Sequence, residues 1–217
     1  LDYDLPSFSF NEFFIDLTCL TKADTAWAEE GHELARSQFA LPVKQTEPER
    51  VNIKDMNPIT VTEAEGAPQN VTIKGYDFEY VFNKDKGHFT SMKNNGAELL
   101  GGATRFTLWR GQTSNDRRFS MGHWSYNRMF EAIEQVHGLT ITTTDKYATI
   151  RVQYALGGLA MLPVLRYTAY WIVFGNGEIS VSVSAEMRDT VINIPRFGLE
   201  VPMRAGSEYV KYFGMGP

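Results

Sequence analysis

The sequence predicts an all-β protein with one short helix, and three features of the chain indicate this class. Stretches rich in aromatic and β-branched residues, typical of β-strands, recur along most of its length. Residues 178–185 (EISVSVSA) alternate apolar and polar side chains, as expected of a strand with one buried and one solvated face. Only residues 124–138 (WSYNRMFEAIEQVHG) have helical spacing.

The composition is that of a folded protein and excludes several classes of partner. Of 217 residues, 43% are hydrophobic and 22% are charged, which argues against disorder over most of the chain. A net charge of −5 argues against binding to nucleic acid, because phosphate-backbone binding needs a basic face. No apolar run approaches the roughly 20 residues that span a bilayer, so no membrane partner is expected. The first ten residues, LDYDLPSFSF, lack the basic and apolar regions of a signal peptide.

The beginning of the chain differs in character from the rest. Residues 1–42 contain a strand pair, roughly 8–41, that is too small for a core of its own and is expected to be the end of a truncated domain. Residues 43–70 are polar, contain three prolines and have weak periodicity, so they are predicted to be a linker. Residues 71–217 form the main domain.

Two hairpins are predicted in the main domain. Residues 166–174 and 178–187 meet through Gly175-Asn176-Gly177, whose residues tolerate the positive φ of a tight turn. Residues 77–92 form the second, with 83–87 as the connection. Further strands are predicted at 13–20, 71–73, 105–109, 139–144 and 148–154.

The predicted helix over residues 124–138 has one apolar face and is expected to pack on a sheet. Gly138 follows as a C-cap. The apolar face consists of Tyr126, Met129, Phe130, Ile133 and Val136.

The sequence offers little catalytic or metal-binding chemistry. The single Cys19 excludes an intramolecular disulfide and a cysteine-based zinc site, and its place in an alternating strand predicts a small buried residue. His32, His88, His123 and His137 lack metal-ligand spacing. Carboxylates are numerous, but no pair is marked as converging on one bond. No catalytic residue and no metal ligand is therefore predicted.

Residues 106–117 (FTLWRGQTSNDR) are the strongest candidate for a functional site. An apolar strand leads into Trp109 and Arg110 and then into a polar loop with Asn115 and Asp116. Asn and Asp brace tight loops through their own backbone hydrogen bonds, which would make the segment structural. The same residues also suit the presentation of an aromatic platform and hydrogen-bonding groups to a sugar. Both interpretations stay open.

This segment resembles the FWRAPTDND signature of β-galactosidases of glycoside hydrolase family 2. Trp109, Arg110, Thr113, Asn115 and Asp116 match it, whereas Gly111, Gln112 and Ser114 replace the usual Ala, Pro and first Asp. Residues 25–41 resemble the end of the family's immunoglobulin-like domain through Trp27, Gly31, His32 and Gln38. Residues 195–199 (PRFGL) and 213–217 (FGMGP) resemble the family's PRIG…WLGLGPQENYPDR, so the matches run in order along nearly the whole chain.

The resemblance implies a galactose-mutarotase-like β-supersandwich at 71–217, incomplete at its C-terminus, preceded by the last strands of an Ig-like domain at 1–42. In the family the two catalytic glutamates lie on an upstream TIM barrel, so this chain is expected to be inactive by itself. The parent enzyme would hydrolyse terminal β-D-galactosides. Asn115, Asp116 and the following residues 117–120 would lie near the substrate, which adds Arg117 to Trp109 and Arg110 as expected substrate-binding residues.

The resemblance also implies partners. A β-galactoside or galactose would bind the intact enzyme, the upstream TIM barrel would contact this domain, and a homo-oligomer would be a further assembly. No cofactor is expected in this part, although parent enzymes often use Mg and Na at the barrel. The sequence does not identify the compartment, and both the cytoplasm and the periplasm of a bacterium stay open.

Two alternatives belong to other classes. The first is a stand-alone carbohydrate-binding β-sandwich that uses Trp109 and Trp124 as platforms. The second is a purely structural or oligomer-forming module, in which Arg110 and Asp116 would be buried and paired with each other instead of lining a cleft.

Overall fold

The computed structural model describes residues 8–9, 12–45, 52–212 and 214, and these divide into two compact units, Leu1–Asn52 and Ile53–Pro217. The expected family motif at 213–217 lies outside the described residues except for Gly214. No helix in the described part of the chain is long and apolar enough to cross a membrane.

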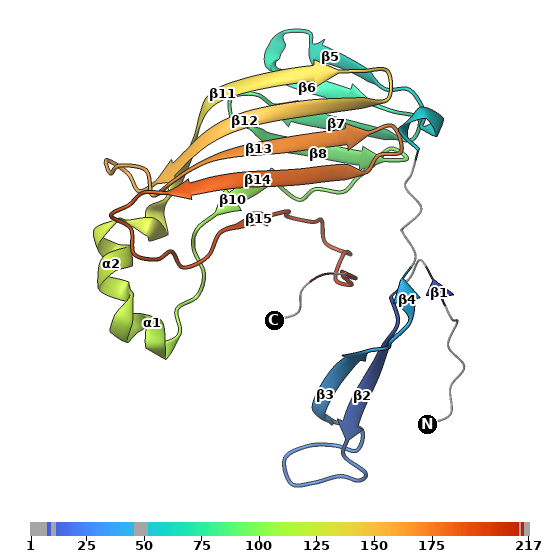
Figure 1. The fold of residues 1–217 in the computed structure, drawn as a ribbon, viewed down its shortest axis with the longest axis vertical. Helices are drawn as coiled ribbons and strands as arrows, with labels where there is room; N and C mark the ends of the chain where they lie inside the picture. Colours follow the sequence, from blue (N-terminus) through green and yellow to red (C-terminus); the bar gives the residue numbers. More distant parts are fainter. Residues whose placement is uncertain (1–7, 10–11, 46–51, 213, 215–217) are drawn as a thin grey trace. The chain divides into compact units, whose positions relative to one another are not determined.

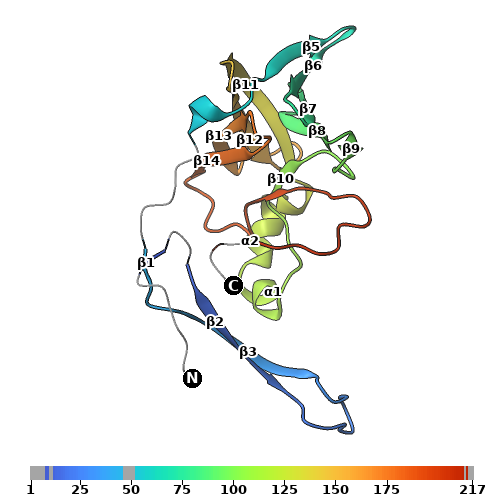
Figure 2. The same ribbon diagram turned by 90° about the vertical axis from the view of Figure 1, so that its right-hand side faces the viewer.

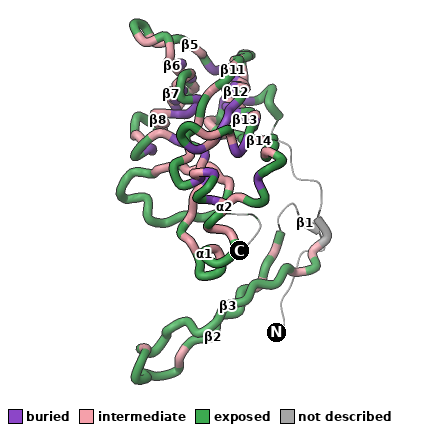
Figure 3. The backbone as a smooth tube through the Cα atoms, turned by 90° about the vertical axis from the view of Figure 1, so that its left-hand side faces the viewer, coloured by how far each residue is buried: buried purple, intermediate pink, exposed green. Residues whose placement is uncertain are grey.

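The first unit is built on one antiparallel hairpin. Strands β2 (Phe14–Leu20) and β3 (Glu33–Ala40) pair along their length, and the short β1 (Phe8–Ser9) and β4 (Lys44–Gln45) pair in parallel. Most residues of β2 and all residues of β3 are exposed (Figure 3). The prediction of a buried Cys19 is therefore wrong, because the described residues of this unit form no second layer over either face of the ribbon.

The second unit is a sandwich of two antiparallel sheets, which confirms the predicted all-β class (Figures 1 and 2). In each sheet the strands follow one another in chain order. The five-stranded sheet consists of β5 (Thr60–Ala64), β6 (Ala67–Lys74), β7 (Phe78–Asn83), β8 (His88–Asn94) and β9 (Ala97–Glu98). The four-stranded sheet consists of β11 (Ile133–Thr143), β12 (Tyr147–Gly157), β13 (Leu165–Phe174) and β14 (Ile179–Met187).

An aromatic core fills the space between the two sheets. Trp171 of the four-stranded sheet lies edge-on to Phe82 and Phe89 of the five-stranded sheet, with ring centroids 6.3 and 5.5 Å apart. All three side chains are almost fully buried, and alternate residues of β7, β12 and β13 are buried in the same core. Burial of this apolar area is the main force that holds the two sheets together.

Both predicted hairpins are confirmed. Val173 pairs with Ile179 across the turn at Gly175-Asn176-Gly177, and Gly177 has the positive φ of +82° that such a turn requires. Asn83 pairs with His88 across the second turn, where Gly87 has a φ of +72°.

The predicted linker at 43–70 is wrong for its second half. A 3-10 turn, η1 (Ile53–Asp55), begins the second unit, and β5 and the start of β6 are strands of the five-stranded sheet. Polar residues alternate with Val61 and Val71 there, so this hairpin has the composition of a loop although one face of it packs on the core.

The helix predicted at 124–138 is also wrong in its second half. The structure has two short helices, α1 (Ser114–Phe119) and α2 (Met121–Tyr126), then a 3-10 turn η2 (Met129–Glu131), and β11 begins at Ile133. Arg128 takes a left-handed conformation that ends the helical path. Pairing of β11 with β12 outweighs the local helical pattern, and a bulge at His137 shifts the register before Gly138, the predicted C-cap.

Two short strands and the helices complete the unit. β10 (Arg105–Thr107) pairs with β15 (Gly198–Glu200), and α1 and α2 follow β10 in sequence at one end of the sandwich (Figure 1). This arrangement places residues 108–113 directly between β10 and α1, and residues 114–117 on α1 itself.

Candidate functional site

The candidate segment starts from a buried anchor. Leu108, directly after β10, is 1% exposed, and the half-buried Trp109 packs against the core. The Trp109 ring lies edge-on to Trp124 of α2 and to Phe130 of η2, with centroids 6.0 Å apart in both pairs. Trp109 therefore ties β10 to the helical end of the sandwich.

Helix α1 begins with a reciprocal cap. The Thr113 N–H donates to Asp116 Oδ2 at 2.7 Å, and the Asp116 N–H donates to Thr113 Oγ1 at 3.3 Å. The sequence Thr-Ser-Asn-Asp thus forms a capping box in which Asp replaces the more usual Glu or Gln. The negative charge at the start of the helix also suits the helix dipole.

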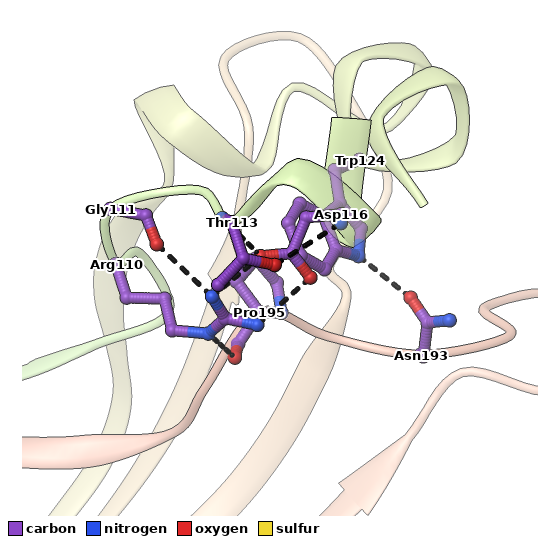
Figure 4. A network of polar contacts seen from close by, with 7 residues as sticks. All are labelled: Arg110, Gly111, Thr113, Asp116, Trp124, Asn193 and Pro195. Atoms are coloured by element: carbon purple, nitrogen blue, oxygen red, sulfur yellow. Dashed lines mark hydrogen bonds and ion pairs between the residues drawn. The ribbon is translucent and has the colours of Figure 1, made fainter. Parts of the chain in front are cut away.

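Arg110 binds the same carboxylate and ties it to a distant part of the chain (Figure 4). Its Nη1 and Nη2 atoms donate to Asp116 Oδ2 and Oδ1 at 2.6 and 3.0 Å, a bidentate ion pair. Its Nε donates to the Pro195 carbonyl at 2.8 Å, and Nη1 also donates to the Gly111 carbonyl at 3.0 Å. The guanidinium group lies over the Trp124 ring at 5.6 Å.

These bonds change the acidity of Asp116. The Arg110 guanidinium group, with a smaller contribution from the Thr113 N–H, lowers the pKa of the Asp116 carboxyl from 3.8 to about 2. The same pairing raises the pKa of Arg110. Both groups are therefore charged at neutral pH and bound to each other.

Arg110 and Asp116 thus meet part of the criterion set for a structural module. They pair with each other, and the Asp116 side chain is only 12% exposed, whereas the Arg110 side chain keeps 34% of its surface exposed.

Trp124 is not a binding platform. Its side chain is 2% exposed, and its Nε1 donates to Asn193 Oδ1 at 2.7 Å (Figure 4). The alternative that uses Trp109 and Trp124 as sugar platforms is therefore wrong for Trp124, because a stacking platform needs a free ring face.

Asn115 and Arg117 are the two predicted site residues that face solvent. Both lie on the first turns of α1 and are exposed, and neither side chain makes a hydrogen bond or ion pair with another described residue. The structure therefore divides the five predicted residues in two groups. Trp109, Arg110 and Asp116 build the loop, and Asn115 and Arg117 are presented by it.

A second polar cluster was not predicted from the sequence. His88 of β8 is buried and its Nε2 bonds to Glu134 Oε1 of β11, which joins the two sheets. The other carboxylate oxygen of Glu134 accepts the Phe106 N–H at 3.2 Å. Burial, with the nearby Glu134 charge, raises the pKa of the Tyr167 phenol.

This cluster lies at a cavity of about 570 Å³ that is also lined by Thr104, Arg105 and Pro202. No sequence signal marked the pair, since 46 residues separate the two side chains and Glu134 lay in the predicted helix. In the described residues no group of three or more His, Cys, Asp or Glu side chains is arranged to hold a metal ion.

Comparisons with known proteins match both parts of the chain to β-galactosidases. A family model described as the β-galactosidase small chain matches residues 74–217, and one described as β-galactosidase, domain 4, matches residues 1–42. Curated relatives include the β-galactosidases of Priestia megaterium, 31% identical over 95% of this chain, and Staphylococcus xylosus, 29% identical over 90%. That of Streptococcus thermophilus is 25% identical over 96%. The chain spans only 19% of the length of each of these three relatives.

Proposed function

The chain belongs to the β-galactosidase small-chain family, and on this premise we propose that it is a non-catalytic part of a β-galactosidase, in which it frames the substrate site. The parent enzyme would hydrolyse terminal β-D-galactosides with two carboxylates supplied by another part of the protein. The relatives that carry the name β-galactosidase are about five times longer than the matched region, which leaves room for a separate catalytic domain.

The observation that carries the proposal is that the predicted site residues at 109–117 fall in two groups, one that fixes the local structure and one that faces solvent. Arg110 and Asp116 are bound to each other and fix the start of α1, so they hold the exposed Asn115 and Arg117 in a defined position. An amide both donates and accepts hydrogen bonds, and a guanidinium group donates five N–H groups in a rigid fork. These are the groups that suit the ring of hydroxyls on a sugar.

Two measurements test the proposal. The purified chain is expected not to hydrolyse a nitrophenyl β-galactoside, and measurable turnover above a blank would contradict the non-catalytic assignment. In the intact enzyme, Asn115→Ala and Arg117→Ala are each expected to lower kcat/KM by about fivefold to tenfold, as for the loss of one net hydrogen bond to the substrate. Arg166→Ala, an exposed arginine on β13, serves as the matched control and is expected to leave kcat/KM unchanged.

A structural role is the second candidate, and the Arg110–Asp116 pair is the observation that favours it. In that case Asn115→Ala and Arg117→Ala would leave kcat/KM at the level of the Arg166→Ala control. Only variants of the pair would then lower activity, and they would do so in proportion to the loss of folded enzyme.

A further inference from the structure

The chain contains two Asn-Gly dipeptides, and the structure holds them in contrasting ways. Asn95-Gly96 forms the turn between β8 and β9, where Asn94 pairs with Ala97. Asn176-Gly177 forms the turn between β13 and β14. Both asparagines are exposed.

Asn-Gly is the dipeptide in which an asparagine side chain is attacked most readily by its own backbone. The nitrogen of the following residue must reach the side-chain Cγ, and glycine has no side chain to obstruct the approach. The reaction therefore requires a backbone N–H that is free of hydrogen bonds and a turn that can change its conformation.

The turn at Asn95 meets the first requirement, and one backbone hydrogen bond ties it to another segment, from the Asn95 N–H to the Asp77 carbonyl at 2.6 Å. The Gly96 N–H donates no hydrogen bond to any described residue, and an added Cβ at Gly96 would meet nothing within 4 Å. Asn95 has a φ of 47°, an uncommon conformation for a residue with a side chain. Its amide Nδ2 donates to Asn94 Oδ1 at 2.8 Å, a bond between two neighbouring residues at the surface.

The turn at Asn176 meets neither requirement. The Gly177 N–H donates to the Phe174 carbonyl at 2.9 Å, and Asn176 Oδ1 accepts the Glu178 N–H at 3.1 Å. The Gly177 carbonyl accepts the Tyr80 hydroxyl at 2.8 Å, which ties the turn to the opposite sheet. The buried Gly175 packs against the Asn57 carbonyl, so the turn has little room to move.

From this contrast we propose that Asn95 is a site of spontaneous deamidation in the folded protein and that the fold protects Asn176. The Gly96 nitrogen loses its proton to solvent and attacks Asn95 Cγ. A C–N bond forms, the side-chain nitrogen takes up a proton from solvent, the Cγ–N bond breaks to release ammonia, and a succinimide ring results. Water then opens the ring at either carbonyl and yields aspartate or isoaspartate.

Deamidation changes the charge of the turn and, in the isoaspartate product, its backbone length. The new carboxylate lies on the surface that carries Asp77, Glu79 and Lys93. Isoaspartate adds one carbon to the main chain directly before β9. In β9 the Glu98 carboxylate accepts the N–H groups of Met92 and Leu100 at 2.8 and 3.0 Å, so the isoaspartate form is expected to loosen this anchor.

Tryptic peptide mapping after ageing at mildly alkaline pH tests the proposal. The two asparagines fall on separate peptides, 94–105 and 167–188, so each reaction is followed by the mass gain and fragment ions of its own peptide. Samples are aged folded and in concentrated urea. In urea the two sites are expected to react at similar rates, because both then depend on the same dipeptide.

In the folded protein Asn95 is expected to react at least about tenfold faster than Asn176, since the reaction at Asn176 needs two additional hydrogen bonds to break. An Asn95→Gln variant is expected to remove the modification of peptide 94–105. The proposal is overturned if Asn176 reacts as fast as Asn95 in the folded protein. It is equally overturned if Asn95 stays intact when folded yet reacts in urea.

Discussion

The guanidinium group of Arg110 donates to both carboxylate oxygens of Asp116, with Nη1–Oδ2 and Nη2–Oδ1 distances of 2.6 and 3.0 Å. The same carboxylate caps helix α1, and the same guanidinium group reaches the Pro195 carbonyl. One ion pair therefore joins the loop after β10, the start of a helix and the segment before β15.

Replacement of Asp116 by Asn is expected to lower the melting temperature by a few degrees. The amide keeps the size of the side chain, but it loses the charge that binds Arg110 and weakens the cap of α1. Thermal unfolding followed by circular dichroism measures the change. Asp189→Asn, an exposed carboxylate in the same unit, is the control, and an equal melting temperature for both variants would contradict the role of the pair.

Acid is expected to remove the stability that Asp116 contributes. The folded-state pKa of this carboxyl is about 2, below its ordinary value of 3.8, so the unfolded chain binds the proton more readily. The contribution is complete above about pH 4 and is lost as the pH falls toward 2. Unfolding free energies of the wild type and Asp116→Asn should therefore converge over this window. A difference that stays constant between pH 5 and about pH 2 would refute the pKa assignment.

Trp124→Ala is expected to destabilise the protein by about 3–5 kcal/mol, the usual cost of deleting a large buried aromatic side chain. Tyr126→Ala lies on the same helix but alters a side chain that is 77% exposed, so a change within about 0.5 kcal/mol is expected. Urea unfolding measures both. Similar losses for the two variants would show that the packing of Trp124 against Trp109 does not hold α2 in place.

Loss of the Glu134 carboxylate is expected to cost about 3–5 kcal/mol, because Glu134→Ala leaves His88 and the Phe106 N–H buried without their partner. Glu134→Gln keeps an oxygen that can accept one of these bonds and should cost less. The neighbouring Gln135→Ala changes an exposed side chain on the same strand and serves as the control. If Glu134→Ala unfolded at the same urea concentration as Gln135→Ala, the pair would not join the sheets.

Local patterns predicted the hairpins but not the start of β11. Gly175-Asn176-Gly177 tolerates the positive φ that a tight turn requires and lies between two strand-like stretches, so the sequence alone identified both flanking strands. Residues 129–136 have helical spacing, and only the pairing of Ile133 with Gly157 and of Val136 with Tyr154 decides that they form a strand. Such pairing depends on residues 24 and 18 positions further along the chain.

The candidate site shows the same limit at the level of side chains. The sequence singled out residues 109–117 and predicted a polar loop there, yet it could not show that residues 114–117 form the start of α1 or which side chains face inward. Trp124 was proposed as a platform because the sequence around it does not reveal that it is buried. Its burial depends on Trp109 and Asn193, which come from other segments. His88 and Glu134 went unnoticed for the same reason, since the contact exists only when the two sheets are stacked.

The order of the strands has a consequence for how the second unit folds. Each sheet is a meander of neighbours in the chain, whereas Arg105 and Glu200 of the β10–β15 pair are far apart in sequence. Low contact order within each sheet favours rapid pairing of its strands, so we expect each meander to form as it leaves the ribosome. We expect the β10–β15 pair to form last. In pulse-labelled hydrogen exchange, amides of β12 and β13 should gain protection before those of β15. Both sheets would thus form during synthesis, and the last step of folding would be a single event in which β10 pairs with β15.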